Sequence, residues 1–412
     1  MLTIHQSKLP RTNEVPAIGL AIAGGGPLGA IYELGALRAM DESITGLRLD
    51  KLDIYVGISA GALIASCLAN GFSSAELCRV FIGTRHAQFK FDPERLLQPA
   101  WSEYLKRAIQ IPGAVGKLLE EYIRNPFSSS AGSTLNALGS IVPTGIFNNT
   151  TIDKFLSKVF SQQDRTNSFK ELEGKLIVLA VDLDSGELRR FGSTEDMDTP
   201  ISKAVQASAA LPGLFPPVQI DGRDYVDGAL RRTMHGSAAL DEGLDLLLGI
   251  NPLVPYHSRR KKSSYHLTQH NLVEGGLPQV ISQTYRAILQ SRMRIGFSKY
   301  RRNYPGSDLL LQEPDRDDEA IFYTNLFSFS SRYRLIEHAY QVTRQNLLEN
   351  RDALSPLLAR YGYELNIDLL KKKPHTIRDS LKNDRGADAP VAIKLKSVLD
   401  DLEDTLRHIQ HR

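Results

Sequence analysis

The sequence predicts an α/β protein in which a central, mostly parallel sheet lies between helices on both faces. Two patterns lead to this prediction: short apolar runs alternate with segments of helical periodicity, and glycine-rich turns join two of those runs to the helices that follow. The composition agrees, because 42% of the 412 residues are hydrophobic and 24% are charged, as in soluble globular proteins.

The first part of the chain reads as alternating strands and helices. An apolar strand at 18–23 ends in glycines, and Ile31, Leu34 and Leu37 then recur at helical spacing. Ser73 and Glu76 have the spacing of a capping box, which predicts the start of another helix. The expected order is a strand at 18–23, a helix from 30, a strand at 52–56, a helix ending at 68 and a helix from 73 to 80.

The rest of the chain divides into a less regular segment, further strands and a helical extension. Residues 89–137 are predicted to be an insertion or lid, because Pro, Ser and Gly interrupt their amphipathic pieces. The expected elements after it are strands at 175–181, 187–191, 218–220, 224–226 and 244–250, the last of these being the final strand, followed by amphipathic helices at 280–293 and 334–348. We therefore expect a catalytic domain at 15–255 and a helical extension at 256–375.

The C-terminal region is predicted to be a linker followed by an amphipathic helix, together spanning 376–412. The stretch KKKPHTIRDSLKNDRGADAP has the composition of a linker, and apolar residues then recur near one helix face at Val391, Leu395, Val398, Leu402 and Ile409. Three interpretations of this helix stay open: it packs on its own domain, it forms a dimer contact, or it lies on a membrane surface.

The glycine-rich turn in AIAGGGPLG could cradle either of two negative charges. Gly24, Gly26 and Gly29 fit the G-x-G-x-x-G spacing of a dinucleotide-binding turn, and the same backbone could hold the oxyanion of an acyl transfer. A dinucleotide site needs an acidic residue at the end of the next strand. Asp50 and Asp53 lie at the opposite end of that strand, so the sequence disfavours a dinucleotide. No G-K-[ST] follows, which excludes a P-loop.

A second motif, Gly57-Ile-Ser-Ala-Gly61, lies between a predicted strand and a predicted helix. This context is typical of a nucleophile elbow, in which a sharp turn presents the Ser59 hydroxyl above the sheet. Glycines at both ends allow the backbone to pass close to neighbouring elements. The N-terminus of the following helix also favours negative charge nearby.

A serine nucleophile requires a base, and Asp227 is the candidate we favour. It ends a short strand and precedes Gly228, so its carboxylate could point into a site, although Asp-Gly is also an ordinary turn pair. Asp221-Gly222 is expected to be such a turn. The histidines downstream, at 235, 257, 266 and 270, have no strand-end context and are expected to be surface or loop residues.

Together, GGGPLG, GISAG and DGA, in that order and with ASAALPGLFPP before the last, resemble the patatin-like phospholipase family. The resemblance extends over about residues 18–252. It implies a three-layer α/β sandwich with a mostly parallel sheet and a lipid acyl hydrolase that uses a Ser-Asp dyad without histidine. Carried onto this sequence, Ser59 is the nucleophile and Asp227 the base.

The resemblance also implies roles for the glycines. Gly24, Gly25 and Gly26 would offer backbone N–H groups to the oxyanion, and each such donor is worth about 3–4 kcal/mol in acyl transfer. The remaining motif glycines are Gly29, Gly57, Gly61 and Gly228. One position departs from the family pattern: Leu28 stands where members usually carry a basic residue.

The expected substrate is a lipid or another acyl ester, cleaved without a metal or cofactor. The alternatives are a hydrolase of acyl-CoA or a storage polyester, and a weakly active lipid-binding scaffold. The basic run Arg259, Arg260, Lys261 and Lys262 could meet anionic headgroups, or it is a solvated loop. The net charge of +3 is too small to indicate a nucleic-acid partner.

The expected location is the cytoplasm, with peripheral membrane contact as an addition. The N-terminal residues lack the apolar stretch of a secretory signal, and no apolar run reaches the ~20 residues that span a bilayer. The two cysteines, Cys67 and Cys78, form no disulfide framework, and Cys67 is expected to be a buried, inert thiol. The sequence leaves the oligomeric state open.

Overall fold

The computed structural model describes residues 1–9, 13–82, 99–100, 143–162, 164–194, 196–256, 273, 276–322 and 329–383. The predicted insertion at 89–137, the basic run at 259–262 and the amphipathic helix at 391–409 therefore lie outside the described residues, apart from Pro99 and Ala100. In the described part of the chain, no helix has both the length and the apolar character needed to cross a bilayer.

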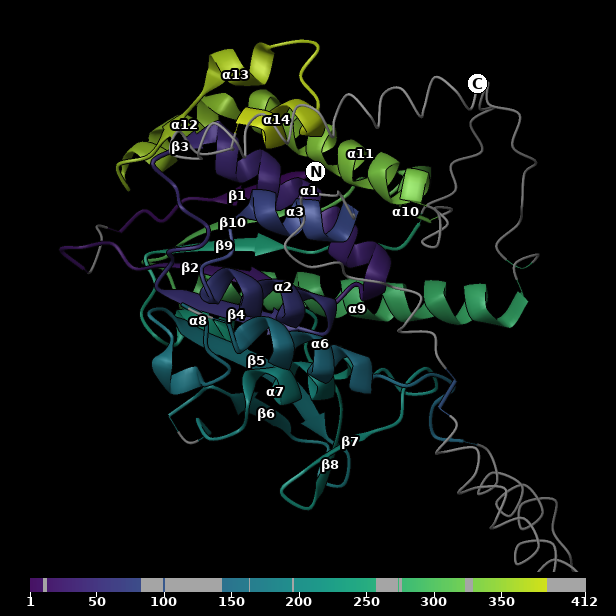
Figure 1. Ribbon diagram of the computed structural model, residues 1–412. Coiled ribbons are helices and arrows are strands. Elements are labelled where there is room, and N and C mark those ends of the chain that lie inside the picture. Colours follow the sequence, from purple (N-terminus) through teal and green to yellow (C-terminus); the bar gives the residue numbers. More distant parts are fainter. Residues whose placement is uncertain are drawn as a thin grey trace, which may run out of the picture.

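A nine-stranded mixed sheet forms the centre of the fold (Figure 1). Its strand order is β1-β10-β9-β2-β4-β5-β8-β7, with β6 paired to β5, and the run from β10 to β5 is parallel. The strands are β1 (Leu2–His5), β2 (Ile18–Ile22), β4 (Ile54–Ile58), β5 (Lys175–Asp182), β6 (Leu188–Phe191), β7 (Val218–Ile220), β8 (Arg223–Asp227), β9 (Leu246–Ile250) and β10 (Asp308–Gln312). The predicted α/β class with a mostly parallel sheet is confirmed.

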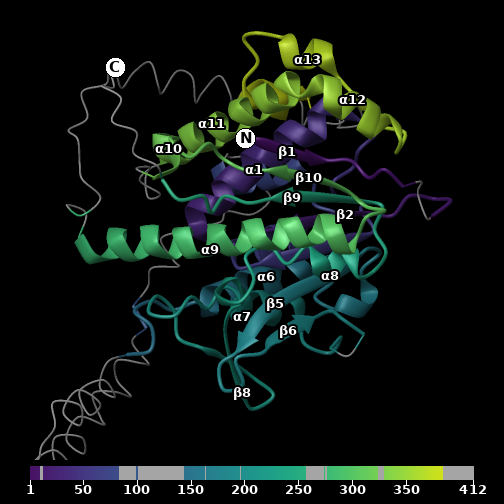
Figure 2. The same ribbon diagram turned by 180° about the vertical axis from the view of Figure 1, so that it is seen from behind.

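Helices cover both faces of this sheet and make three layers (Figures 1 and 2). One face carries α1 (Gly26–Ser43), α2 (Ala60–Ala69), α3 (Ser74–Ile82), α6 (Thr150–Phe160) and α7 (Ile201–Ser208). The other face carries α8 (Ser237–Leu240) and the long α9 (Gly276–Asn303). Side chains alternate between two apolar cores: Leu20 and Ile22 of β2 belong to the first, and Ala21 and Ala23 to the second.

The extension after β9 is mainly helical, as predicted, and packs on the first layer. Its helices besides α9 are α10 (Glu319–Phe322), α11 (Phe329–Glu349), α12 (Arg351–Ala359), α13 (Ile367–Lys371) and α14 (Ile377–Asn383). Helix α11 lies along α1, and at Gly35 of α1 a Cβ atom would come within 2.5 Å of the Ile336 carbonyl oxygen. A two-stranded sheet of β3 (Ile44–Thr45) and β11 (Glu364–Leu365) joins the extension to the end of α1.

Three short sequence signals, namely the capping box, the glycine run and the Asp-Gly turn, are found at the ends of helices and strands in the structure. The capping box is present, because the Ser73 N–H donates to Glu76 Oε2 at 2.8 Å and the Glu76 N–H donates to Ser73 Oγ at 3.2 Å. Helix α1 begins at Gly26, four residues earlier than predicted, so the glycine run itself forms the start of the helix. The predicted hairpin turn at Asp221-Gly222 joins β7 to β8.

The prediction that the strand at 244–250 is the last one is wrong. Residues Asp308–Gln312 form β10, which pairs in parallel with β9, and β1 then pairs with β10 from the N-terminus. Thus the segment 256–375 contributes a strand to the sheet of the segment 15–255. The run DLLLQ is short and lies between long helical segments, so periodicity alone does not mark it as a strand.

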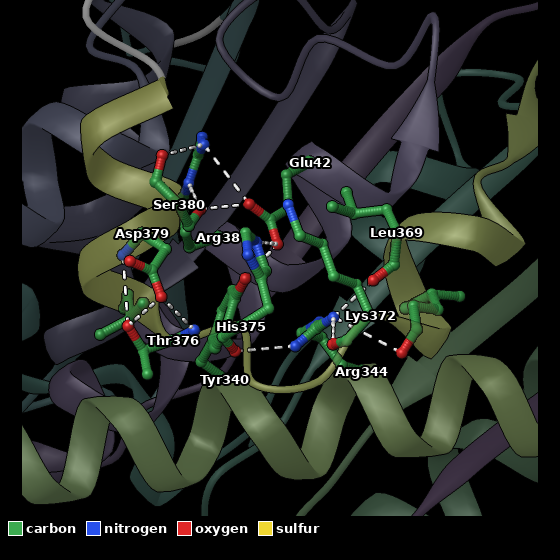
Figure 3. Close-up of polar contacts among 12 residues, drawn as sticks. Arg38, Glu42, Tyr340, Arg344, Leu369, Lys372, His375, Thr376, Asp379 and Ser380 are labelled. Carbon is green, nitrogen blue, oxygen red and sulfur yellow. Dashed lines mark hydrogen bonds and ion pairs between the residues drawn. The ribbon is translucent and has the colours of Figure 1, made fainter.

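The prediction of a linker over 371–390 is also wrong for residues 374–383. Thr376 and Asp379 form a second capping box that starts α14, with the Thr376 N–H donating to Asp379 Oδ2 at 3.0 Å. Around it, Arg38 donates to Ser380 Oγ at 2.7 Å, and Glu42 contacts both Ser380 and Tyr340 (Figure 3). These buried polar contacts hold residues 374–383 against α1 and α11.

Candidate active site

Ser59 lies at the junction between β4 and α2, in a conformation that few residues adopt. Its φ of 54° and ψ of −124° place it in the left-handed half of φ/ψ space, which costs an L-amino acid about 1–3 kcal/mol. The residue is 8% exposed. A sharp turn of this kind at the carboxyl end of a parallel strand is the geometry of a nucleophile elbow.

The glycines on either side of Ser59 are required by close backbone contacts. At Gly61, a Cβ atom would lie 2.4 Å from the Ala23 carbonyl oxygen, and at Gly57 it would lie 2.4 Å from Ala62 Cα. Both distances are far below van der Waals contact, so any side chain would displace the elbow from the sheet. The glycine positions of the motif are thus explained by packing.

Asp227 ends β8 and its carboxyl group lies beside the Ser59 hydroxyl. It is only 2% exposed, and the Ala229 N–H donates to its Oδ1 at 2.8 Å. Burial raises the pKa of Asp227 to about 6, and hydrogen bonding from the Ala229 N–H and the Ser59 hydroxyl partly offsets that increase. At Gly228, a Cβ atom would come within 2.3 Å of the Leu179 carbonyl oxygen, so glycine is needed here too.

The glycine loop lies directly against this pair. A Cβ atom at Gly24 would lie 3.0 Å from the Cβ of Ser59 and 3.5 Å from that of Ala229. Gly25 is the N-cap of α1 and makes no side-chain capping bond, and Gly26 has a φ of +60°. The first N–H groups of a helix have no acceptor within it, and the helix dipole is positive at this end. The loop therefore brings the start of α1, where backbone N–H groups have no acceptor within the helix, beside Ser59.

Gly29 has a supporting place in the loop. Its N–H donates to the Gly25 carbonyl oxygen at 3.0 Å, and its Cα lies so close to Gly25 that a Cβ atom there would come within 2.6 Å. Pro252, after β9, packs on both glycines. Leu28, on the same turn of α1, is half-buried and packs on the larger apolar core. A hydrocarbon side chain thus lies where the sequence resemblance implies a positive charge.

Ser208 is a site residue that the sequence analysis did not single out. It ends α7 and is fully buried, and its hydroxyl accepts from the Ser59 N–H at 2.8 Å while donating to the Leu179 carbonyl oxygen at 2.6 Å. Because Ser208 accepts the Ser59 N–H, that donor is occupied within the protein. The segment ASAALPGLFPP contains Ser208, but nothing in its pattern distinguishes this serine from a helical surface residue.

Tyr285 of α9 is a second residue found only from the structure. Its hydroxyl oxygen is buried and has no hydrogen-bond partner among the described residues. Burial raises the pKa of Tyr285, and the negative charge of Asp227 raises it further. The same helix contacts the segment after Asp227, because the Arg292 guanidinium donates to the Leu230 carbonyl oxygen.

Of the downstream candidates for a histidine base, only His235 lies within the described residues, and it does not supply a base to this pair. His235 lies in a loop, as predicted, but is buried, and burial with the nearby Arg190 and Arg232 lowers its pKa to about 3. The histidines at 257, 266 and 270 lie outside the described residues. Within the ranges described, no group of three or more His, Cys, Asp or Glu side chains could hold a metal ion. Cys67 and Cys78 are both buried and form no disulfide among the described residues, and burial raises the pKa of Cys67 to about 12.

Comparisons with known proteins bear on the family of this chain. A family model described as patatin-like phospholipase matches residues 20–235, just over half of the chain. A protein of Acanthamoeba polyphaga mimivirus is 24% identical over 252 residues, covering 60% of this chain and 69% of its own. A probable lipid hydrolase of Invertebrate iridescent virus 6 is 22% identical over 211 residues, covering 51% of this chain and 59% of its own.

Solved structures with a partly similar fold include bacterial and human proteins. VipD from Legionella pneumophila aligns with a TM-score of 0.31 at 14% identity, covering 85% of this chain and 80% of its own. Human GIVD cytosolic phospholipase A2 aligns with a TM-score of 0.32 at 12% identity, covering 86% of this chain and 61% of its own.

Proposed function

The chain belongs to the patatin-like phospholipase family, and we propose that it is a serine esterase that hydrolyses acyl esters of lipids. The observation that supports this most directly is the contact between Ser59 and Asp227 beside the glycine loop. The family's lipid chemistry and the probable lipid hydrolase among the relatives favour a phospholipase A or lysophospholipase type of substrate.

In the first half of the proposed reaction, Asp227 takes the hydroxyl proton of Ser59 as Oγ attacks the acyl carbonyl carbon. With a pKa of about 6, this carboxylate is ionised at neutral pH and is a stronger base than an exposed aspartate. The tetrahedral intermediate carries its negative charge on the former carbonyl oxygen. Backbone N–H groups of Gly24, Gly25 and Gly26 would stabilise that charge.

Collapse of the intermediate completes this half: it expels the alcohol, which takes the proton from Asp227, and leaves an acyl group on Ser59 whose hydrolysis is the second half. Water then loses a proton to Asp227 and attacks the acyl carbon. Breakage of the bond to Oγ releases the fatty acid and returns the proton to Ser59. The same carboxyl group therefore acts as base and then as acid in each half.

The test is hydrolysis of a p-nitrophenyl acyl ester and of a phospholipid by the purified chain, beside the Ser59→Ala variant. We expect the wild type to cleave both and Ser59→Ala to cleave neither above background, while a fluorophosphonate labels only the wild type at Ser59. Equal rates for the two proteins would refute the proposal. Failure of the folded wild type to take the label would instead favour a scaffold role.

A further inference from the structure

Helix α9 exposes an apolar stripe that the sheet does not cover. Ile281, Ile288 and Ile295 are 57%, 47% and 56% exposed, and Val280 is 40% exposed. Seven residues make nearly two helical turns, so the three isoleucines lie close to one line along the helix. Four of the eleven exposed large apolar side chains in the described residues lie on this one helix, so the stripe is a concentrated feature.

The opposite side of α9 explains why these isoleucines face outward. Leu289, Met293, Phe297 and Tyr300 are buried and belong to the apolar core on this side of the sheet. The helix is thus already packed through one face, and its second apolar stripe has no role in that core. Figure 2 shows α9 in front of the sheet along most of its length, with no described helix or strand in front of it.

The charge on this helix is entirely positive. Residues 276–303 contain six basic side chains and no acidic one, although the whole chain is nearly balanced at 50 basic and 47 acidic residues. Arg286 is buried, and the other five basic residues are exposed. Arg292 and Lys299 lie next to the isoleucines, Arg302 is close to them, and Arg294 and Arg301 border the other edge of the exposed face.

This surface is continuous with the candidate active site. The Arg292 guanidinium donates to the Leu230 carbonyl oxygen, three residues after Asp227. On the same helix, the Tyr285 ring lies close enough to Asp227 for the aspartate charge to raise the pKa of the tyrosine. A ligand on the outer face of α9 would therefore lie beside the segment that directly follows the proposed base.

We propose that the outer face of α9 (Ile281, Ile288 and Ile295 with Arg292, Arg294 and Lys299) binds an anionic lipid bilayer. Isoleucines would enter the region between headgroups and acyl chains, and the cations would meet lipid phosphates, as in interfacial amphipathic helices. The charge argues against a second copy of this chain, because two such faces would bring basic helices together with no acidic side chain of α9 between them.

The first experiment measures co-sedimentation of the full-length Ser59→Ala variant with lipid vesicles. The inference rests on the proposed function for the class of lipid, but this variant cannot hydrolyse it, so binding and activity are separate results. We expect binding to phosphatidylcholine vesicles that contain about a third phosphatidylglycerol, and much weaker binding to pure phosphatidylcholine. Equal binding to both vesicles, or to neither, would overturn the proposal.

Two sets of variants locate the surface. Arg294→Gln with Lys299→Gln should weaken binding about 25-fold, at about fivefold for each charge removed near the bilayer. Ile281→Ser with Ile288→Ser and Ile295→Ser should weaken it by at least about tenfold. The matched control, Lys371→Gln with Lys373→Gln, removes two exposed charges near α13 and should change binding little. If the control lowers binding as much as the α9 pair, the surface is not α9.

A fluorescent reporter identifies what covers the stripe. Ile288→Cys in the full chain, labelled with an environment-sensitive dye, should show a blue shift only when anionic vesicles are added; both native cysteines are buried. A blue shift already present without lipid would overturn the proposal. If that shift disappears on dilution, a second copy is the occupant, and if it persists, another segment of the same chain is.

Discussion

The backbone N–H of Ser59 donates to the hydroxyl of Ser208, 2.8 Å away. We expect Ser208→Ala to destabilise the fold by about 1–3 kcal/mol, because it removes the acceptor of that buried N–H and the hydroxyl donor to the Leu179 carbonyl oxygen. The strained elbow would also relax, and kcat should fall by about tenfold or more with a smaller change in KM. Steady-state kinetics and urea unfolding measure the two effects.

Ser202 provides the control for this prediction. It lies on the same helix, is equally buried, and donates to Asp153 Oδ1 at 2.6 Å, away from the elbow. Ser202→Ala should therefore lower stability and leave kcat unchanged. If both alanine variants reduce kcat to the same extent, the effect of Ser208 is one of general stability and the positioning role is wrong.

The conformation of Ser59 predicts an unusual order of stability for two variants. At a φ of 54°, glycine avoids the steric cost that alanine would retain, although glycine loses more backbone entropy on folding. We expect Ser59→Gly to be more stable than Ser59→Ala by about 1 kcal/mol. Both variants should lack esterase activity, and chemical denaturation gives the difference.

A residue with ordinary helical geometry should show the reverse order. Ser66 lies inside α2, seven residues after the elbow. Ser66→Gly should be less stable than Ser66→Ala by about 1 kcal/mol, the usual cost of glycine in a helix. The same order at both positions would mean that Ser59 carries no backbone strain in solution.

The raised pKa of Asp227 predicts opposite effects of pH on activity and stability. The proposed base must be ionised, so kcat/KM should fall as the pH drops through about 6. The folded pKa lies above the usual value of 3.8, so the folded state favours the protonated form. Protonated Asp227 therefore contributes to the free energy of unfolding. This contribution is fully present below the unfolded pKa and is lost as the pH rises through the folded pKa.

Asp227→Asn separates these two effects. At a pH of about 8 the variant should be more stable than the wild type by about 3 kcal/mol, because it no longer buries a charge, and it should be inactive. The difference should disappear as the pH falls to about 3, below the unfolded pKa of 3.8, where Asp227 is largely protonated in both the folded and unfolded states. A stability difference that does not vary with pH would contradict the assigned pKa shift.

The sequence predicts those parts of the fold and candidate site that depend on local chemistry. The glycines at 57 and 61 indicate the elbow because no side chain fits at either position. The Ser73 to Glu76 spacing indicates the start of a helix because both hydrogen bonds of the capping box form within four residues. The order of the three motifs along the chain, together with the family resemblance, predicts that Asp227 lies near Ser59. Each of these signals can be seen within a short window of sequence.

What the sequence does not predict depends on contacts between distant segments. Ser208 reaches Ser59 across 149 positions of the chain, and β10 is a strand only because β9 and β1 lie on either side of it. The lysine-rich stretch before α14 has the composition of a linker, and buried partners on α1 and α11 override that signal. The Thr376 to Asp379 capping box was the local sign that this helix exists.

Arg344 provides a test of how the C-terminal segment is held. It is 4% exposed, and its guanidinium donates to the His375 carbonyl oxygen at 2.9 Å and to the Leu369 carbonyl oxygen at 2.6 Å (Figure 3). Arg344→Met would remove both charge-assisted bonds, while Gln341 still donates to the His375 carbonyl oxygen and the Lys372 N–H to that of Leu369. We therefore expect a loss of about 3 kcal/mol. Urea unfolding measures that loss, and limited proteolysis should show faster cleavage within residues 372–383.

Two further substitutions show whether the geometry of the arginine matters. Arg344→Lys keeps the charge but cannot span both carbonyl groups, so it should recover only part of the lost stability. Arg351→Met removes an exposed arginine at the start of α12, 44% exposed, and should change stability by less than about 0.5 kcal/mol. If Arg344→Lys is as stable as the wild type, charge alone holds the segment; if Arg344→Met is as stable as Arg351→Met, the carbonyl contacts do not stabilise it.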